Sequence, residues 1–143
     1  MKILYSLTIS IPIFEDLQKK YPDSQFVHVE THEDFERECP DCDALIIMGS
    51  HYKQPIADLL KKSAKKLRWI QAGSDGLDKF VIPGIPDGVV ITNTSGTKGR
   101  TISEHAMGLW IALHQKIHEF ERLRISREWE AYRDKMRKET GSI

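Results

Sequence analysis

The residues Gly73-Ser74-Asp75-Gly76 have the composition of a turn that can bind an anion. They follow residues 67–72, an apolar stretch with the character of a β-strand. In a glycine-containing turn at the end of a parallel strand, successive backbone N–H groups can point to one side and bind a negatively charged group. The charge of Asp75 opposes this unless its side chain points away. A tight turn that needs only the backbone freedom of glycine is the competing interpretation.

Two further polar segments could line a site with this turn. Gly49-Ser50-His51 follows the apolar residues 43–48, and His51 is the type of side chain that acts as a general acid. A histidine in such a loop is more often simply solvated. Lys98 lies in the polar loop before the last helical pattern and could attract an anion, although a solvated surface lysine is the more common case.

Two pairs of residues have the spacing of metal ligands or redox groups, Cys39/Cys42 and His114/His118. A zinc site needs about four ligands, and neither pair has a second pair to complete it. A thioredoxin-type CxxC follows a strand and opens a helix, whereas this one closes a helical pattern and precedes a strand. We therefore expect two partly buried thiols that flank a turn, and no metal site.

The elements that must position these loops alternate along the first 94 residues or so. Short apolar stretches at residues 2–9, 25–30, 43–48, 67–72 and 89–92 are separated by helical patterns, one of which has Thr31 and Asp34 at its start as a potential cap. Such alternation is typical of an α/β protein with a doubly wound parallel sheet, and five strands with a buried first strand favour the flavodoxin-like order 2-1-3-4-5. Ligands bind beyond the carboxyl ends of the strands in such sheets, so the loops at 49–53, 73–76 and 93–100 are the candidate site.

The last third of the chain has a different pattern. Thr101 and Glu104 have the spacing of a capping box, and apolar residues then recur every three or four positions over six turns, at Ile102, Ala106, Leu109, Leu113, Ile117, Phe120 and Leu123. This pattern predicts a long C-terminal helix that becomes more polar toward residue 138. We expect two parts, residues 1–100 and residues 101–143.

Composition excludes several classes of function. Lys plus Arg and Asp plus Glu number 21 each, so the formal net charge is zero, which argues against a nucleic-acid or anionic membrane partner. No apolar run reaches the roughly 18 residues that a membrane-spanning helix needs. The apolar N-terminus has no small-residue cleavage site, so we interpret it as a strand and expect a cytoplasmic protein.

From residue 67 to residue 129 the chain resembles the D-isomer-specific 2-hydroxyacid dehydrogenases. The stretch LRWIQAGSDGLD at 67–78 is similar to that family's substrate-loop signature. VITNTSG at 90–96, followed by ISEHA at 102–106, is similar to its crossover into the helix that links two domains. The first 66 residues fit the same N-terminal half by strand order. The resemblance implies the substrate-binding domain of an NAD(P)-dependent oxidoreductase.

The resemblance also implies roles for individual residues. Backbone N–H groups of Gly73, Ser74, Asp75 and Gly76 would hold the carboxylate of a 2-oxo acid, and Gly49, Ser50 and His51 would line the other side. Lys98 and Thr101 would lie near the cofactor. The family's NAD site and its catalytic Arg, Glu and His belong to a nucleotide domain that opens with GxGxxG, and these 143 residues contain no GxGxxG. We therefore expect no catalytic residue and no cofactor site in this chain, a truncated form that is inactive alone.

The apolar stripe of the last helix points to a partner. In the family this helix packs on the nucleotide domain and on a second subunit. Without a nucleotide domain the helix could fold back along its own sheet or pair with the same helix of a second chain, and we expect a homodimer through the helix at 101–125. A non-enzymatic flavodoxin-like binding or dimerisation module is the alternative. A phosphoacceptor domain is disfavoured because no acidic cluster follows the first strand, where Ser6, Thr8 and Ser10 stand.

Overall fold

A computed structural model describes residues 1–7, 11–130 and 132–134 of the chain. The chain divides into two units, Met1–Thr97 and Lys98–Ile143.

The first unit is built on a parallel sheet, as the alternating pattern predicts. The strand order is β2-β1-β3-β4-β5, and every pair of neighbouring strands is parallel. The strands are shorter than the apolar stretches that predicted them: β1 (Lys2–Ser6), β2 (Gln25–His28), β3 (Ala44–Ile47), β4 (Trp69–Ala72) and β5 (Val90–Thr92). Because the chain runs from β1 outward to β2 and then back to β3, the direction of winding reverses between β1 and β3.

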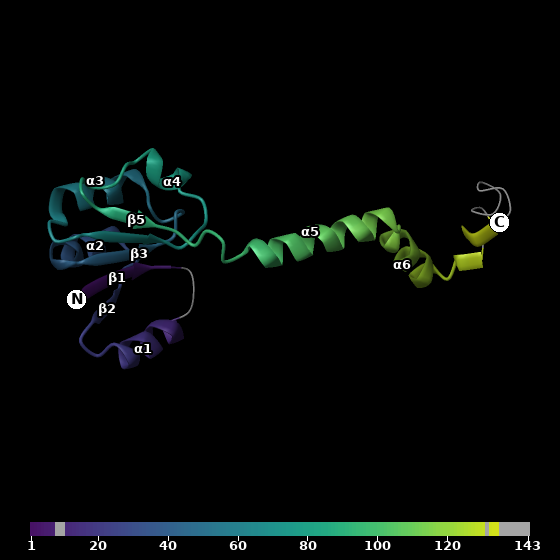
Figure 1. Ribbon diagram of the computed structural model, residues 1–143, viewed down its shortest axis with the longest axis horizontal. Helices are drawn as coiled ribbons and strands as arrows, with labels where there is room; N and C mark the ends of the chain where they lie inside the picture. Colours follow the sequence, from purple (N-terminus) through teal and green to yellow (C-terminus); the bar gives the residue numbers. More distant parts are fainter. Residues whose placement is uncertain (8–10, 131, 135–143) are drawn as a thin grey trace. The chain divides into compact units, whose positions relative to one another are not determined.

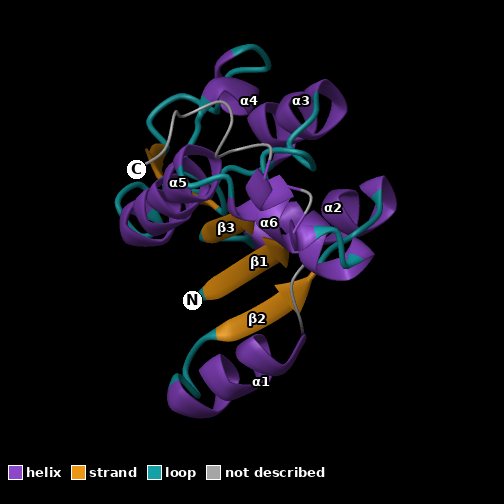
Figure 2. Cartoon of the chain, turned by 90° about the vertical axis from the view of Figure 1, so that its right-hand side faces the viewer, coloured by secondary structure: helices purple, strands orange, loops and turns teal. Residues whose placement is uncertain are grey.

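Helices lie on both faces of this sheet (Figure 1). Three helices, α2 (His32–Glu38), α3 (Gln54–Ser63) and the single turn α4 (Asp78–Val81), lie on one face, and α1 (Ile11–Lys20) lies on the other. Figure 2 shows α1 beside β2 at the edge of the sheet. This arrangement follows from right-handed crossovers, because the connections that lead to β3, β4 and β5 all run in one direction.

The core lies between the sheet and the helices α2 and α3. Leu4, Leu45 and Ile70 point into it from three neighbouring strands, and each is fully buried. Phe35 of α2 and Leu60 of α3 pack against them with 2% and 1% exposure. Continuous burial along β3 explains why its sequence is apolar without alternation.

The cap predicted for α2 is present. The Asp34 N–H donates to Thr31 Oγ1 over 3.1 Å, and the Thr31 N–H donates to the Asp34 carboxylate over 3.0 Å. These bonds satisfy backbone donors that the helix itself cannot satisfy. The same bonds, together with Arg37, hold the pKa of the Asp34 carboxyl well below its usual value.

The opposite face of the sheet is covered unevenly within this unit. Phe14 of α1 stacks on Tyr5 of β1 with the ring centroids 3.6 Å apart. Over β4 and β5, by contrast, Trp69 is 36% exposed and Val90 is 60% exposed. The covered half of this face therefore lies over β1 and β2.

Between residues 98 and 126 the second unit has two helices where the apolar pattern predicts one. Helix α5 (Gly99–His114) and helix α6 (Ile117–Ser126) are separated at Lys116, whose φ of 53° is left-handed. A non-glycine residue in that region cannot continue a right-handed helix, so the expected six-turn stripe is interrupted. None of the helices within the described residues is long and apolar enough to span a bilayer.

The predicted capping box at Thr101 and Glu104 is wrong. Helix α5 begins two residues earlier, at Gly99, and Lys98 occupies the N-cap position without a side-chain cap bond. Glu104 instead accepts a hydrogen bond of 2.8 Å from Arg100, four residues before it. This ion pair on the helix surface takes the carboxylate away from the backbone N–H that a capping box requires.

The central strand supplies the first prediction. Replacing Leu45 by alanine should lower the free energy of unfolding by about 2–5 kcal/mol, because the fully buried side chain would leave a cavity between sheet and helices. Urea unfolding followed by circular dichroism measures the loss. The control is Ile82→Ala, since Ile82 is 88% exposed and should cost almost nothing. Equal losses in the two variants would contradict the described core.

Candidate functional site

The loops after β3 and β4 pack closely at the carboxyl edge of the sheet. A Cβ placed on Gly73 would lie 2.6 Å from Met48 Sδ and 3.0 Å from Leu7 Cδ2. A Cβ placed on Gly49 would lie 3.1 Å from Lys79 Cβ, beside α4. Both positions therefore need the small volume of glycine. The structure thus brings the predicted loops at 49–51 and 73–76 next to each other.

The side chain of Asp75 is turned away from its own turn by the loop that follows β5. Thr94 Oγ1 donates to Asp75 Oδ1 over 2.6 Å, and Asn93 Nδ2 donates to the Asp75 carbonyl oxygen over 2.6 Å. Ser74 Oγ donates to the Gly76 carbonyl over 3.1 Å and braces the turn from inside. The carboxylate that could have repelled an anion is therefore held by its neighbours.

Three successive backbone donors of this turn are available to a ligand. The Gly73 N–H donates to the Ile47 carbonyl over 2.9 Å and so belongs to the sheet. The N–H groups of Ser74, Asp75 and Gly76 have no acceptor among the described residues. Consecutive free N–H groups at the end of a parallel strand can hold a carboxylate or phosphate. We call residues 73–76 the β4 turn.

His51 points toward β1 and forms a second polar group on the same edge. His51 Nδ1 and Ser6 Oγ share a hydrogen bond of 3.0 Å, and Ser6 is 3% exposed. Together with Ser50 and Lys53 they line a cavity of about 270 Å³. Sequence reasoning missed Ser6 as a site residue, because only the pairing of β1 with β3 brings the end of β1 to this loop.

The two residues predicted to lie near a cofactor belong to the second unit. Lys98 is the N-cap residue of α5 and is exposed, and Thr101 is an exposed residue of its first turn. Neither side chain forms a hydrogen bond or an ion pair with another described residue. Both are accessible to a ligand from solvent.

The two cysteines are structural. Cys39 and Cys42 are unpaired thiols with 0% exposure on either side of the short 3-10 turn Cys39–Asp41. Burial, reinforced by the neighbouring Cys39, raises the pKa of the Cys42 thiol to about 12. Burial raises the pKa of Cys39 as well. The thiols are more deeply buried than the sequence indicates, and both stay protonated at neutral pH.

The histidine pair on the C-terminal segment does not share one helix. His114 is the last residue of α5, and His118 lies in α6 beyond the break at Lys116. The i, i+4 spacing that suggests two ligands on one helical face therefore does not apply. Within the described ranges, no group of three or more His, Cys, Asp or Glu side chains is arranged to hold a metal ion.

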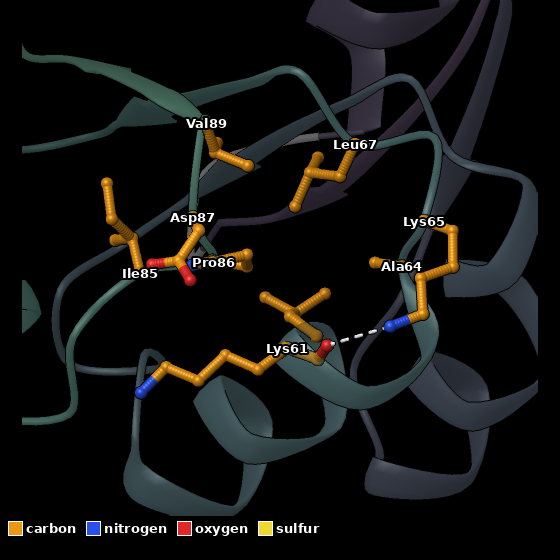
Figure 3. A pocket seen from close by; sticks show the side chains of 9 residues that line it. Lys61, Ala64, Lys65, Leu67, Ile85, Pro86, Asp87 and Val89 are labelled. Carbon is orange, nitrogen blue, oxygen red and sulfur yellow. Dashed lines mark hydrogen bonds between the residues drawn. The ribbon is translucent and has the colours of Figure 1, made fainter.

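A larger cavity lies at the opposite edge of the sheet, where the strands begin. Its volume is about 360 Å³, and it lies between the end of α3 and the segment before β5 (Figure 3). Leu67 and Val89, which precede β4 and β5, form part of its apolar wall. Lys65 Nζ donates to the Lys61 carbonyl over 3.3 Å. This cavity is at the amino ends of the strands, so it is separate from the candidate site.

Comparison with known proteins places the chain by its fold. No family model matches the sequence, and no curated protein matches it. Solved structures do match. A D-isomer specific 2-hydroxyacid dehydrogenase family protein from Aeromonas salmonicida aligns with 88% of this chain at a TM-score of 0.69 and 21% identity. The D-lactate dehydrogenase TP0037 from Treponema pallidum aligns with 89% of it at a TM-score of 0.64 and 16% identity.

A third match was solved with ligands. The D-lactate dehydrogenase of Aquifex aeolicus, complexed with NAD and lactic acid, aligns with 88% of this chain at a TM-score of 0.62 and 13% identity. The chain covers 39%, 40% and 37% of these three proteins, so it spans about two fifths of the length of the structures it matches. The fold is therefore that of part of a D-2-hydroxyacid dehydrogenase.

The buried thiols give a prediction about pH. Both should react slowly with Ellman's reagent in the native protein and rapidly after unfolding. The free thiol of an unfolded chain has a pKa of about 8.5, so the unfolded state loses its protons first as pH rises. Stability should therefore fall progressively above about pH 8.5. Urea unfolding at several pH values measures this fall.

The control for the pH effect is Cys42→Ala, which should lose part of the decline above about pH 8.5 while it keeps the fold. Tyr52 contributes at higher pH, because burial raises its pKa to about 12. Rapid reaction of both thiols in the native protein would contradict their burial.

Proposed function

We propose that residues 1–97 bind the substrate of an oxidoreductase that interconverts 2-oxo acids and 2-hydroxy acids, with NAD or NADP as the hydride carrier. The observation that carries the proposal is the set of three free N–H groups in the β4 turn, at the carboxyl edge of a sheet shared with D-2-hydroxyacid dehydrogenases. A 2-oxo acid has a carboxylate beside its reactive carbonyl, so fixing the carboxylate also places the carbonyl.

The β4 turn suits a carboxylate for two reasons. Its three donors are fixed by the strand before it and by the bonds from Asn93 and Thr94 after it, so little conformational freedom is lost on binding. Of the two carboxylates near the turn, that of Asp75 is engaged by the Thr94 hydroxyl, and that of Asp78 lies beside Gly76. Ser50 and His51 are proposed to contact the remainder of the ligand.

The redox half of the reaction needs groups outside these 143 residues. The sequence contains no GxGxxG, the fingerprint of a dinucleotide-binding domain. We propose that a nucleotide-binding domain supplies these groups, near Lys98 and Thr101, and that this chain alone is inactive. A cytoplasmic location fits the use of a nicotinamide cofactor.

The β4 turn is tested by two variants that change the electrostatics in opposite directions. Asp75→Asn removes a charge but keeps the acceptor for Thr94, so pyruvate and glyoxylate should bind a few times more tightly at low salt. Thr94→Val frees the carboxylate, so binding should weaken about tenfold. Calorimetry or NMR titration of the 143-residue chain measures both.

The control is Asp87→Asn, which removes a charge at the distant cavity and should leave pyruvate binding unchanged. NADH oxidation with pyruvate, glyoxylate or hydroxypyruvate should stay at background in every variant. Turnover by the wild-type chain would contradict the proposed division of labour. Absence of any saturable shift at residues 74–76 would contradict the substrate site itself.

We also propose that the chain forms a homodimer through α5. No residue of α5 is buried, and its large apolar side chains are 44–66% exposed: Ile102, Met107, Leu109, Trp110, Ile111 and Leu113. Covering such side chains contributes roughly 1.5–3 kcal/mol each, and a symmetric pairing lets one stripe cover its own copy. The break at Lys116 limits this interface to four turns or so. This observation also favours the alternative function, a dimerisation module without enzymatic activity.

The dimer is tested by charge substitutions on one face of α5. Leu109→Glu combined with Leu113→Glu should convert a species of about 33 kDa, twice the chain mass of 16.5 kDa, into a monomer in sedimentation experiments. The matched control is Ile82→Glu, at an 88% exposed position of the first unit. A wild-type chain that sediments as a monomer at all concentrations would refute the proposal.

A further inference from the structure

The cavity beside His51 is lined by residues at the carboxyl ends of three neighbouring strands. Ser6 is the last residue of β1, Glu30 follows β2, and Ser50, His51 and Lys53 follow β3. Because β1 lies between β2 and β3, the acidic residue and the basic residue reach the cavity from opposite sides of Ser6. This is also the point at which the winding of the sheet reverses, where doubly wound proteins bind their ligands.

The two charges of the cavity are not engaged by each other. Neither the Glu30 carboxylate nor the Lys53 ammonium forms an ion pair or a side-chain hydrogen bond with another described residue. Both side chains are exposed at the rim. A residue with an anionic side chain and one with a cationic side chain thus line one cavity, and neither charge is engaged by another described residue.

The inner part of the cavity is preorganised. The Ser6 side chain is almost fully buried, and its hydrogen bond of 3.0 Å fixes the ring of His51. The Ser6 carbonyl accepts a hydrogen bond of 3.1 Å from the Met48 N–H, which holds the end of β1 against the loop after β3. Phe35 and Ile56, both buried, form the apolar part of the lining.

We propose that this cavity binds a small zwitterion, an α-amino acid with a short side chain. Lys53 and Ser50 pair with its carboxylate, Glu30 pairs with its ammonium group, and the Ser6–His51 pair accepts or donates a further hydrogen bond. The side chain packs on Phe35 and Ile56. The volume of about 270 Å³ suits such a molecule, since one water occupies about 30 Å³ in the liquid.

This site is distinct from the β4 turn. The β4 turn offers only backbone donors and selects a negative charge, whereas the cavity offers side chains of both signs and selects a molecule that carries both. The two are formed by different strands, β4 in one case and β1, β2 and β3 in the other. Ser50 and His51 line the cavity and are also proposed to contact a 2-oxo acid, so the two ligands compete for these two residues.

NMR titration of the 143-residue chain tests the proposal. Glycine, L-alanine or L-serine should give saturable shifts at the amides of Ser6, Ser50 and His51, with a dissociation constant in the millimolar range. Acetate and methylammonium, which each carry one of the two charges, should bind at least about tenfold more weakly. Glu30→Gln and Lys53→Gln should each weaken amino-acid binding by about tenfold.

Matched controls separate this site from general electrostatics. Glu33→Gln and Lys62→Gln remove the same charges from exposed positions of α2 and α3 that do not line the cavity, and binding should not change. Asp75→Asn should change pyruvate binding alone, so failure of one site does not imply failure of the other. Ser6→Ala should weaken amino-acid binding while the circular dichroism spectrum is retained.

Two results would overturn the proposal. One is the absence of saturable shifts at the cavity with each of the three amino acids at tens of millimolar. The other is binding of acetate as tight as that of the amino acids and unaffected by Glu30→Gln, which would make the cavity a simple anion site.

Discussion

The parallel register of three strands determines where every candidate residue lies. Ser6 of β1 pairs with Ile47 of β3, and Ile47 pairs with Ala72 of β4, so the three strands end at one level. The loops that follow them therefore begin side by side, and a ligand there meets groups from several strands at once. The alternating burial of β4 fixes this level, because a shift by one residue would turn the fully buried Ile70 and Ala72 outward.

The two loops at this edge are stabilised differently, and the two binding sites that we propose depend on this difference. In the β4 turn the side chains are used up in bracing the backbone, with Asp75 held by Thr94 and Ser74 bonded to Gly76, so only N–H groups remain for a ligand. In the loop after β3 the backbone is closed on itself, since the N–H groups of His51 and Tyr52 donate to the Met48 carbonyl. The side chains of Ser50 and Lys53 form no hydrogen bond with another described residue. We therefore propose that the β4 turn binds a charged group through its backbone N–H groups, and that the loop after β3 binds one through its side chains.

Sequence patterns were sufficient for the sheet and for one helix cap but not for contacts between elements. Strand order and the Thr31–Asp34 cap follow from apolar periodicity and from residue types at fixed offsets, which are local properties. The role of Ser6 depends on strand register, which no local pattern specifies. The break at Lys116 lacks the glycine, asparagine or proline that usually marks one, and Thr101 matched a capping box that the Arg100–Glu104 pair displaces.

The exposed half of the sheet contains polar groups that can hydrogen-bond to water, whereas the exposed apolar stripe of α5 contains aliphatic side chains that cannot. Over β4 and β5, Trp69 Nε1 donates to Thr92 Oγ1 over 2.7 Å, and that hydroxyl donates to Gln71 Oε1 over 2.6 Å. This chain of hydrogen bonds makes the surface around Trp69 partly polar, so its exposure is tolerable for an isolated unit. The apolar face of α5 has no comparable polar partners, since Leu109 and Leu113 are aliphatic and more than half exposed. The gain from covering a surface is therefore greater at α5, and contact with a second chain is expected there before it is expected on the sheet.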